Sequence, residues 1–135
     1  TAYEIMPSLV GSEMCIRDRK GKDIYLIGKT YDVFDSKTQV LLLHNPLFRI
    51  VSKVNGVVGI LKGGKRVIVD YLPNVEKIKE GLPVITTSIT GEYPEGINIG
   101  RVKKVIHSYR GHTIKVDVEI GLYFNKADAI FVYLR

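Results

Sequence analysis

The stretch LFRIVSKVNGVVGIL (residues 47–61) contains two short apolar segments separated by Asn55-Gly56. Asn followed by Gly readily takes the two positive φ angles of a type I′ turn. This dipeptide between apolar runs is the strongest short signal for a β-hairpin. Residues 47–54 and 57–61 are therefore predicted to be two antiparallel strands joined by a two-residue turn.

The alternation of apolar and polar residues continues on both sides of this hairpin. In HTIKVDVEI (residues 112–120) every second residue from Ile114 onward is apolar, which is typical of a strand with one wet face. Pro83 is expected to open a strand or to lie on a sheet edge, because it cannot donate to a ladder. A β-bulge is expected at Lys103-Lys104, where the alternation changes phase. The predicted strands cover residues 38–43, 47–54, 57–61, 65–72, 83–88, 97–108, 112–120 and 129–134.

Short strands with turn signals between them, without a long helix-period segment, predict an all-β fold of the small barrel or sandwich type. The chain has 135 residues, with 20 Lys and Arg against 14 Asp and Glu, so its formal net charge is +6. One cysteine cannot form a disulfide framework, and no run approaches the roughly 20 apolar residues of a membrane-spanning helix. The basic charge is compatible with a nucleic acid, an anionic lipid or an acidic protein as partner.

The N-terminal stretch SEMCIRDR (residues 12–19) differs from the rest of the chain and holds its only cysteine, Cys15. Its core MCIRDR matches the translation of an adapter end that a transposase inserts when sequencing libraries are made. Residues 1–19 are therefore predicted to be a non-native or disordered tail and are left out of the fold prediction. The alternative is an ordinary polar N-terminal arm.

Two patterns resemble ligand sites but lack a necessary part. GILKGGK (residues 59–65) has the spacing of a phosphate-binding P-loop, yet Arg66 stands where Ser or Thr would bind Mg²⁺, and a strand follows instead of a helix. His107 and His112 flank a predicted turn without a cysteine pair, so solvated histidines are expected rather than zinc ligands. No catalytic, cofactor-binding or metal-binding residue is predicted, and no cofactor is expected.

Basic residues recur along the chain and leave an alternative function open. Small β-barrels of the OB or SH3 type bind RNA or other polyanions through a basic groove with stacking aromatic residues. The aromatic residues of this chain are not interleaved with the basic clusters in a stacking pattern, which disfavours this alternative. The basic clusters comprise Lys62, Lys65, Arg66, Arg101, Lys103, Lys104, Arg110 and Lys115.

The segment GLPVITTSITGEYPEGINIGRVKKV (residues 81–105) combines turn residues with apolar side chains. Pro94 fixes φ and Gly96 allows a tight turn into the next strand. Gly100, inside a strand, removes a side chain where another backbone approaches closely. Hydroxyls of the Thr-Thr-Ser run can satisfy backbone groups of the loop. The residues assigned to this structural motif are Gly81, Thr87, Ser88, Gly91, Pro94, Gly96 and Gly100.

This segment resembles the signature of the rod shape-determining protein MreC family: a Val/Ile strand ending in Thr-Ser, a glycine-containing loop, Pro-x-Gly, then Ile-x-Ile-Gly-x-Val. The resemblance extends to residues 26–54, a strand–turn–strand run ending in an Asn-Pro turn, and to residues 117–134 at the C-terminus. It covers nearly all of residues 23–135. Leu82 and Gly121 depart from the family pattern, where Asp and Pro are usual, and these departures concern local turn geometry alone.

The resemblance implies two small antiparallel β-barrels, of which this chain holds all of the second and part of the first. Residues 20–46 would be the remnant of the first barrel and residues 47–135 the second, with strand 129–134 able to pack back on the first. Members of the family are non-enzymatic scaffolds of the bacterial cell-elongation machinery that help to maintain rod shape.

The resemblance also implies partners and a location. The partners are a class B penicillin-binding transpeptidase, other membrane proteins of the elongation complex and further copies of the scaffold, and no nucleic acid. The location is the extracytoplasmic face of the bacterial cytoplasmic membrane, with anchoring only through an N-terminal helix missing from this chain. Partner capture is expected through an exposed strand edge or an apolar groove. The candidate contact residues are Ile89, Tyr93, Ile97 and Ile99.

Overall fold

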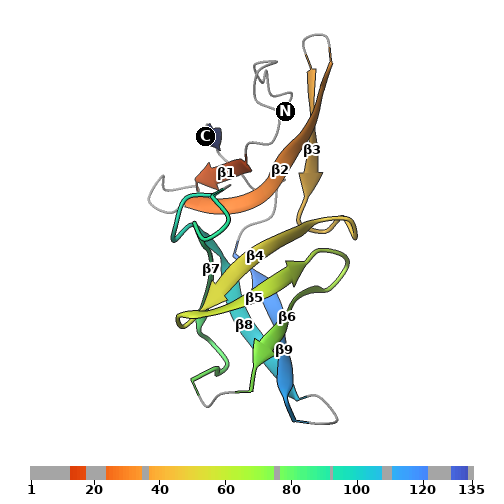
Figure 1. Ribbon diagram of the computed structural model, residues 1–135. Helices are drawn as coiled ribbons and strands as arrows, with labels where there is room; N and C mark the ends of the chain where they lie inside the picture. Colours follow the sequence, from red (N-terminus) through yellow and green to blue (C-terminus); the bar gives the residue numbers. More distant parts are fainter. Residues whose placement is uncertain are drawn as a thin grey trace.

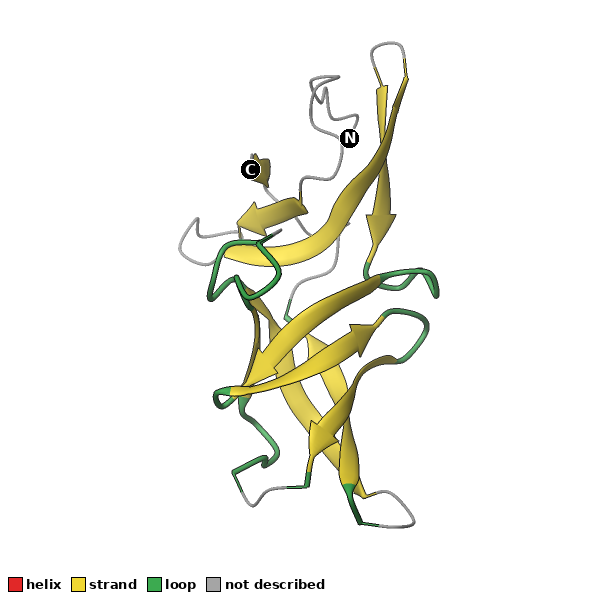
Figure 2. Cartoon of the chain, viewed as in Figure 1, coloured by secondary structure: helices red, strands yellow, loops and turns green. Residues whose placement is uncertain are grey.

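The computed structural model describes residues 13–17, 24–34, 37–74, 77–91, 93–107, 111–121 and 129–133. These residues form strands joined by turns and loops, with no helix among them (Figure 1, Figure 2), which confirms the predicted all-β fold. The strands are β1 (Glu13–Arg17), β2 (Ile24–Phe34), β3 (Lys37–Leu42), β4 (Arg49–Val54), β5 (Val57–Lys62), β6 (Val67–Pro73), β7 (Pro83–Thr86), β8 (Asn98–His107), β9 (Thr113–Ile120) and β10 (Ala129–Tyr133).

Six of the strands close into an antiparallel barrel. Neighbours in the order β8-β7-β4-β5-β6-β9 are hydrogen-bonded, and β9 returns to pair with β8 from Gly100 opposite Ile120 to His107 opposite Ile114. Closure gives each of these strands a neighbour on both sides, which removes the open sheet edges of a flat arrangement. The predicted antiparallel barrel is thus confirmed.

Four further strands extend the sheet beyond the barrel (Figure 1). β2 and β3 form a hairpin, β1 lies on the other side of β2, and β10 pairs with β1. A single parallel pair, Tyr25 opposite Asn98, joins β2 to β8 of the barrel. The division of the chain between residues 46 and 47 stays a prediction, because strand pairing alone does not define a domain boundary.

Part of the N-terminal segment is a strand. Glu13–Arg17 form β1 and pair with both β2 and β10, where the sequence predicted a non-native or disordered tail. The other residues of 1–19 lie outside the described ranges. The non-native origin of the segment stays a prediction.

The longest of the described strands, β2, with 11 residues, was not predicted from the apolar alternation and was expected only through the resemblance of residues 26–54 to a strand–turn–strand run. Gly28 interrupts its apolar pattern, and glycine is depleted in strands. A Cβ added at Gly28 would lie 2.3 Å from the carbonyl oxygen of Leu41 on β3. The missing side chain is therefore what lets β2 and β3 approach each other at this point.

The predicted hairpin and strand start are confirmed. Asn55 and Gly56 have φ angles of 48° and 80°, and Val54 pairs with Val57 across the turn. Pro83 is the first residue of β7. Local backbone preference decides both features, so the sequence alone could predict them.

The predicted β-bulge is also confirmed. The pairing of β8 with β9 shifts register between Val102 and Lys104. A bulge places two residues of one strand opposite one residue of its partner. Consequently Lys103 and Lys104, although adjacent, are both exposed.

The inward residues of the alternating strands form one core. On β9, Ile114, Val116 and Val118 are buried, whereas Lys115 and Glu119 between and beyond them are exposed. Alternation of this kind buries one face of each strand and leaves the other to water. The buried core residues are Leu26, Leu43, Phe48, Ile50, Val54, Leu61, Val67, Val69, Leu72, Ile78, Val84, Tyr93, Ile99, Val102, Ile114, Val116 and Val118.

Candidate functional site

The loop between β7 and β8 (residues 87–97, described except for residue 92) is closed at its base by Thr86. The hydroxyl of Thr86 donates to the carbonyl oxygen of Pro94 (2.7 Å) and accepts the backbone N–H of Ile97 (2.9 Å). The backbone N–H of Thr86 donates to Ile97 O (2.9 Å), and Gly96 N–H donates to Thr86 O (3.0 Å). Because Thr86 is fully buried, these bonds are shielded from water and hold the two ends of the loop together.

Glu95 holds the loop at a second point. Its Oε1 accepts the backbone N–H of Ser88 (2.8 Å) and the hydroxyls of Thr87 (3.1 Å) and Ser88 (3.2 Å). Its Oε2 forms an ion pair with Lys53 of β4. The hydrogen bond from Lys53, followed by that from the Ser88 N–H, lowers the pKa of Glu95 to about 2. The carboxylate thus ties both sides of the loop to the barrel wall.

Glu95 makes the attachment of this loop dependent on pH. Its pKa in the folded protein is about 2, below the ordinary value of 4.5, so its contribution to stability is fully present above about pH 4.5 and is lost as the pH falls through about 2. We expect Glu95→Gln to lower the midpoint of urea unfolding at pH 7. The difference from the unsubstituted chain should shrink as the pH falls from about 4.5 to about 2. Glu119→Gln, at an exposed position of β9, is the control, and a difference for Glu95→Gln that stayed constant with pH would contradict this role.

The predicted motif residues occupy the turns and the base of the loop. Gly96 has a φ angle of 86° where the chain re-enters β8, and Gly81 and Gly91 also have positive φ angles. Glycine adopts this region without steric cost. The hydroxyls of Thr86 and Thr87 bond to backbone groups of the loop, as predicted for the Thr-Thr-Ser run. Thr87 is buried and Ser88 is exposed, and the hydroxyls of both also bond to Glu95.

Two of the four predicted contact residues lie in the core, and the contact role of all four stays a prediction. Tyr93 is 5 % exposed and Ile99 is 0 % exposed. Ile99 occupies an inward position of β8, and Tyr93 packs into the core cluster. Ile97 is half-buried against that cluster, whereas Ile89 is 69 % exposed. Of the four, Ile89 is therefore the residue with an exposed apolar side chain.

A surface depression of about 200 Å³ lies beside the loop, on β4 and β5. Ile60 of β5 lines the depression and is 38 % exposed. Thr90 also lines it, and Ile89 is the residue directly before Thr90 in the sequence. Ile60 is the one exposed apolar side chain among the lining residues, and an exposed apolar side chain at a depression is compatible with a protein-binding surface. The lining residues are Arg49, Ile50, Val51, Ile60, Thr90 and Tyr93. We call this depression, together with Ile89, the β4–β5 face.

Sequence reasoning missed Ile60 although a signal for it was present. Its neighbours on β5, Gly59 and Leu61, are both buried. In a strand with period two, an apolar residue between two inward positions must face outward. An outward isoleucine in a half-buried strand is the signal that could have identified this position.

The other sequence patterns show no chemical site among the described residues. No group of three or more His, Cys, Asp or Glu side chains in these ranges could hold a metal ion. His44, His107 and His112 are all exposed. Residues 59–65 form the end of β5 and the turn into β6, so the hairpin interpretation of the P-loop spacing is confirmed. Within the described ranges, no helix has the length and apolar character needed to cross a membrane.

Comparison with a family model agrees with this barrel architecture. The model of the barrel core of rod shape-determining protein MreC matches residues 10–134. No curated protein matches the chain.

Solved structures similar to this chain share its fold. The structure of MreC from Listeria monocytogenes is 25 % identical with a TM-score of 0.78, and the match covers 91 % of this chain and 60 % of that one. The major periplasmic domain of the cell shape-determining filament MreC is 24 % identical with a TM-score of 0.70, covering 88 % and 75 %. The complex between penicillin-binding protein PBP2 and MreC from Helicobacter pylori is 17 % identical with a TM-score of 0.66, covering 80 % and 71 %. The chain thus spans 60 % of the length of the Listeria structure.

Proposed function

The chain belongs to the family of the rod shape-determining protein MreC, and on that premise we propose that it is a non-enzymatic scaffold that binds a class B penicillin-binding transpeptidase. Family membership over residues 10–134 carries this proposal. The similarity in fold to the complex between PBP2 and MreC from Helicobacter pylori supports it. In this proposal the scaffold works within the cell-elongation machinery and helps to maintain rod shape.

The β4–β5 face is the proposed docking surface for a non-catalytic region of the transpeptidase. Ile89 and Ile60 supply exposed apolar side chains there. Thr86 and Glu95 fix the loop that carries Ile89. A fixed loop loses little conformational entropy on binding, so more of the contact energy is available for affinity.

The proposed location is the extracytoplasmic face of the cytoplasmic membrane, on the periplasmic or cell-wall side. The similarity to a periplasmic domain of MreC supports it. Other membrane proteins of the elongation complex and further copies of the scaffold are proposed as additional partners. Self-association could use β3, since among the described strands β3 pairs with β2 alone and leaves its other edge open.

Ile89→Asp is expected to weaken binding of the cognate transpeptidase at least about tenfold, because a charge would replace an apolar anchor in the contact. The unfolding midpoint should stay unchanged, since the side chain is 69 % exposed. Titration calorimetry with the extracytoplasmic part of the transpeptidase would measure the affinity. Ile24→Asp is the matched control, because Ile24 is also an exposed isoleucine, 45 % exposed, but lies on β2.

Two results would count against the proposal in different ways. Equal affinities for the Ile89→Asp and Ile24→Asp variants would contradict the placement of the contact on the β4–β5 face. Absence of binding by the unsubstituted chain would contradict the proposed partner.

A further inference from the structure

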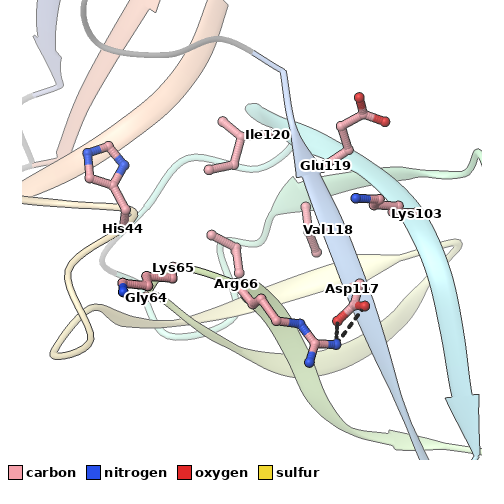
Figure 3. A pocket seen from close by; sticks show the side chains of 10 residues that line it. His44, Gly64, Lys65, Arg66, Lys103, Asp117, Val118, Glu119 and Ile120 are labelled. Atoms are coloured by element: carbon pink, nitrogen blue, oxygen red, sulfur yellow. Dashed lines mark hydrogen bonds and ion pairs between the residues drawn. The ribbon is translucent and has the colours of Figure 1, made fainter.

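A larger pocket lies around β9, away from the residues of the β4–β5 face. In the ring of six strands, β9 is three strands away from β4 in either direction. The pocket has a volume of about 500 Å³ and is formed by β9 with the turn before β6, β8 and the connection between β3 and β4 (Figure 3). We call it the basic pocket, and the lining residues that matter here are Lys65, Arg66, Lys103, Asp117, Val118 and Ile120.

The charges of the basic pocket are unevenly compensated. Nη2 of Arg66 lies 2.7 Å from both carboxylate oxygens of Asp117, so the charge of Asp117 already has a partner. The carboxylate of Glu119 is directed away from Arg66 and Asp117 (Figure 3). Lys65 and Lys103 are exposed and form no ion pair with a described residue. The pocket therefore has two cations available at its rim.

The β-bulge in β8 adds to this positive charge. It leaves Lys104 exposed directly after Lys103 and opposite Asp117. Lys115 is exposed two residues before Asp117 on the same face of β9. Cations on neighbouring strands raise the positive potential over the pocket and favour an anionic partner.

The interior of the basic pocket is apolar. Val67 and Val118 line it although they are only 3 % and 8 % exposed, and Ile120 lines it half-buried. β9 pairs with β6 on one side and β8 on the other, so a partner cannot add a strand at this edge. Recognition must then occur through side chains.

We propose that the basic pocket is a second docking site, which binds an acidic protein segment with an apolar side chain between its carboxylates. The carboxylates would pair with Lys65 and Lys103, and the apolar side chain would cover Val118 and Ile120. A polyphosphate or an RNA strand could use the same cations but would leave the apolar interior uncovered. Because the two surfaces share no lining residue, the barrel can hold two partners at once.

Peptide binding to the whole chain tests this proposal without the transpeptidase. The probe is a fluorescein-labelled peptide Glu-Glu-Val-Leu-Glu-Glu, and its comparators are Glu-Glu-Gly-Gly-Glu-Glu and inorganic polyphosphate. We expect the Val-Leu peptide to bind about tenfold more tightly than the Gly-Gly peptide, since it alone buries apolar side chains. Its affinity should fall as salt rises from about 50 mM to about 300 mM, because the rim charges are exposed and screened.

Charge reversal locates the binding. The double variant Lys65→Glu/Lys103→Glu is expected to lower the affinity for the Val-Leu peptide at least about tenfold. Its matched control, Lys77→Glu/Lys79→Glu, changes net charge equally at two exposed lysines between β6 and β7 and should change the affinity less than about twofold. The Ile89→Asp variant should keep full affinity for the peptide.

Three results would overturn the proposal. Equal loss in both double variants would show that net charge alone attracts the peptide. Polyphosphate binding as tight as that of the Val-Leu peptide, and lost in the Lys65→Glu/Lys103→Glu variant, would make the pocket a general polyanion site. If the unsubstituted chain did not bind the Val-Leu peptide, the pocket would not be a docking site for acidic segments. None of these three results affects the proposed binding of a transpeptidase at the β4–β5 face.

Discussion

Gly100→Ala is expected to lower the free energy of unfolding by about 3 kcal/mol, because the added methyl group has no room where the barrel closes. A Cβ at this position would lie 2.0 Å from the carbonyl oxygen of Glu119 and 3.1 Å from Cα of Ile120. Both are backbone atoms of β9, so no side-chain rotation can relieve the contact. β8 and β9 would have to separate at the pairing that closes the ring. Urea unfolding at neutral pH measures the change.

Whether Gly100→Ala raises or lowers the free energy of unfolding is informative by itself. Alanine reduces the freedom of the unfolded chain and, at a position without steric conflict, stabilises a protein by about 0.4–1 kcal/mol relative to glycine. Lys104→Ala is the control, because Lys104 is exposed on the same strand, and it should change stability by less than about 0.5 kcal/mol. A Gly100→Ala variant as stable as this control would show that β8 and β9 do not approach as closely as the structure indicates.

Local sequence signals predicted most of the barrel. The Asn55-Gly56 turn, the start of β7 at Pro83 and the bulge before Lys104 depend on backbone preferences of a few adjacent residues, and all three are confirmed. Gly100 was predicted to allow a close backbone approach, but the sequence could not identify Glu119 as the neighbour. Which strands meet across the ring depends on contacts between residues far apart in the chain, and such contacts leave no local pattern.

The candidate site was predicted less well for the same reason. Tyr93 and Ile89 stand four residues apart in one loop, yet one is buried and the other exposed, because the loop folds onto the barrel in a way that alternation does not describe. Glu95 has no neighbouring sequence signal that sets it apart from other acidic residues of the chain. Its partner Lys53 lies 42 residues away, and nothing near Glu95 in the sequence indicates that pairing.

Asp70 is a second carboxylate whose surroundings could not be predicted from the sequence. It is 7 % exposed, accepts the N–H of Tyr71 (2.8 Å) and pairs with Lys62 at 3.1 Å. Burial acts to raise its pKa, but the hydrogen bonds from Tyr71 and Lys62 and the positive charges of Lys115 and Lys62 together outweigh burial, so the pKa lies below its ordinary value. Tyr71 has a φ angle of 60° where the pairing of β6 with β9 shifts register. Asp70 pairs across the sheet with Ile60 of β5, so its side chain lies on the outer face beside Lys62 rather than in the core.

Phe48→Ala is expected to cost about 3–5 kcal/mol of unfolding free energy, the range for removal of a large buried aromatic side chain. Phe48 is 0 % exposed and belongs to one core cluster with Leu26 of β2 and Leu43, which follows β3. Its carbonyl oxygen accepts the N–H of Gly63 (2.9 Å), and Nζ of Lys29 lies 5.9 Å from the centre of its ring. The side chain therefore fills the space between the β2–β3 hairpin and the barrel. A cavity there would weaken the attachment of the hairpin as well as the barrel itself.

Leu47→Ala is the matched control for this experiment, because Leu47 is adjacent to Phe48 but 76 % exposed. It should change the unfolding free energy by less than about 0.5 kcal/mol. Since small domains have a total stability of about 5–15 kcal/mol, the expected loss for Phe48→Ala is a large share of the total stability. Urea unfolding of both variants at the same temperature measures the difference. A loss for Phe48→Ala no larger than that for Leu47→Ala would mean that Phe48 is not enclosed. Packing at the junction would then have to depend on other members of the core cluster, with Leu26 and Leu43 the next residues to replace.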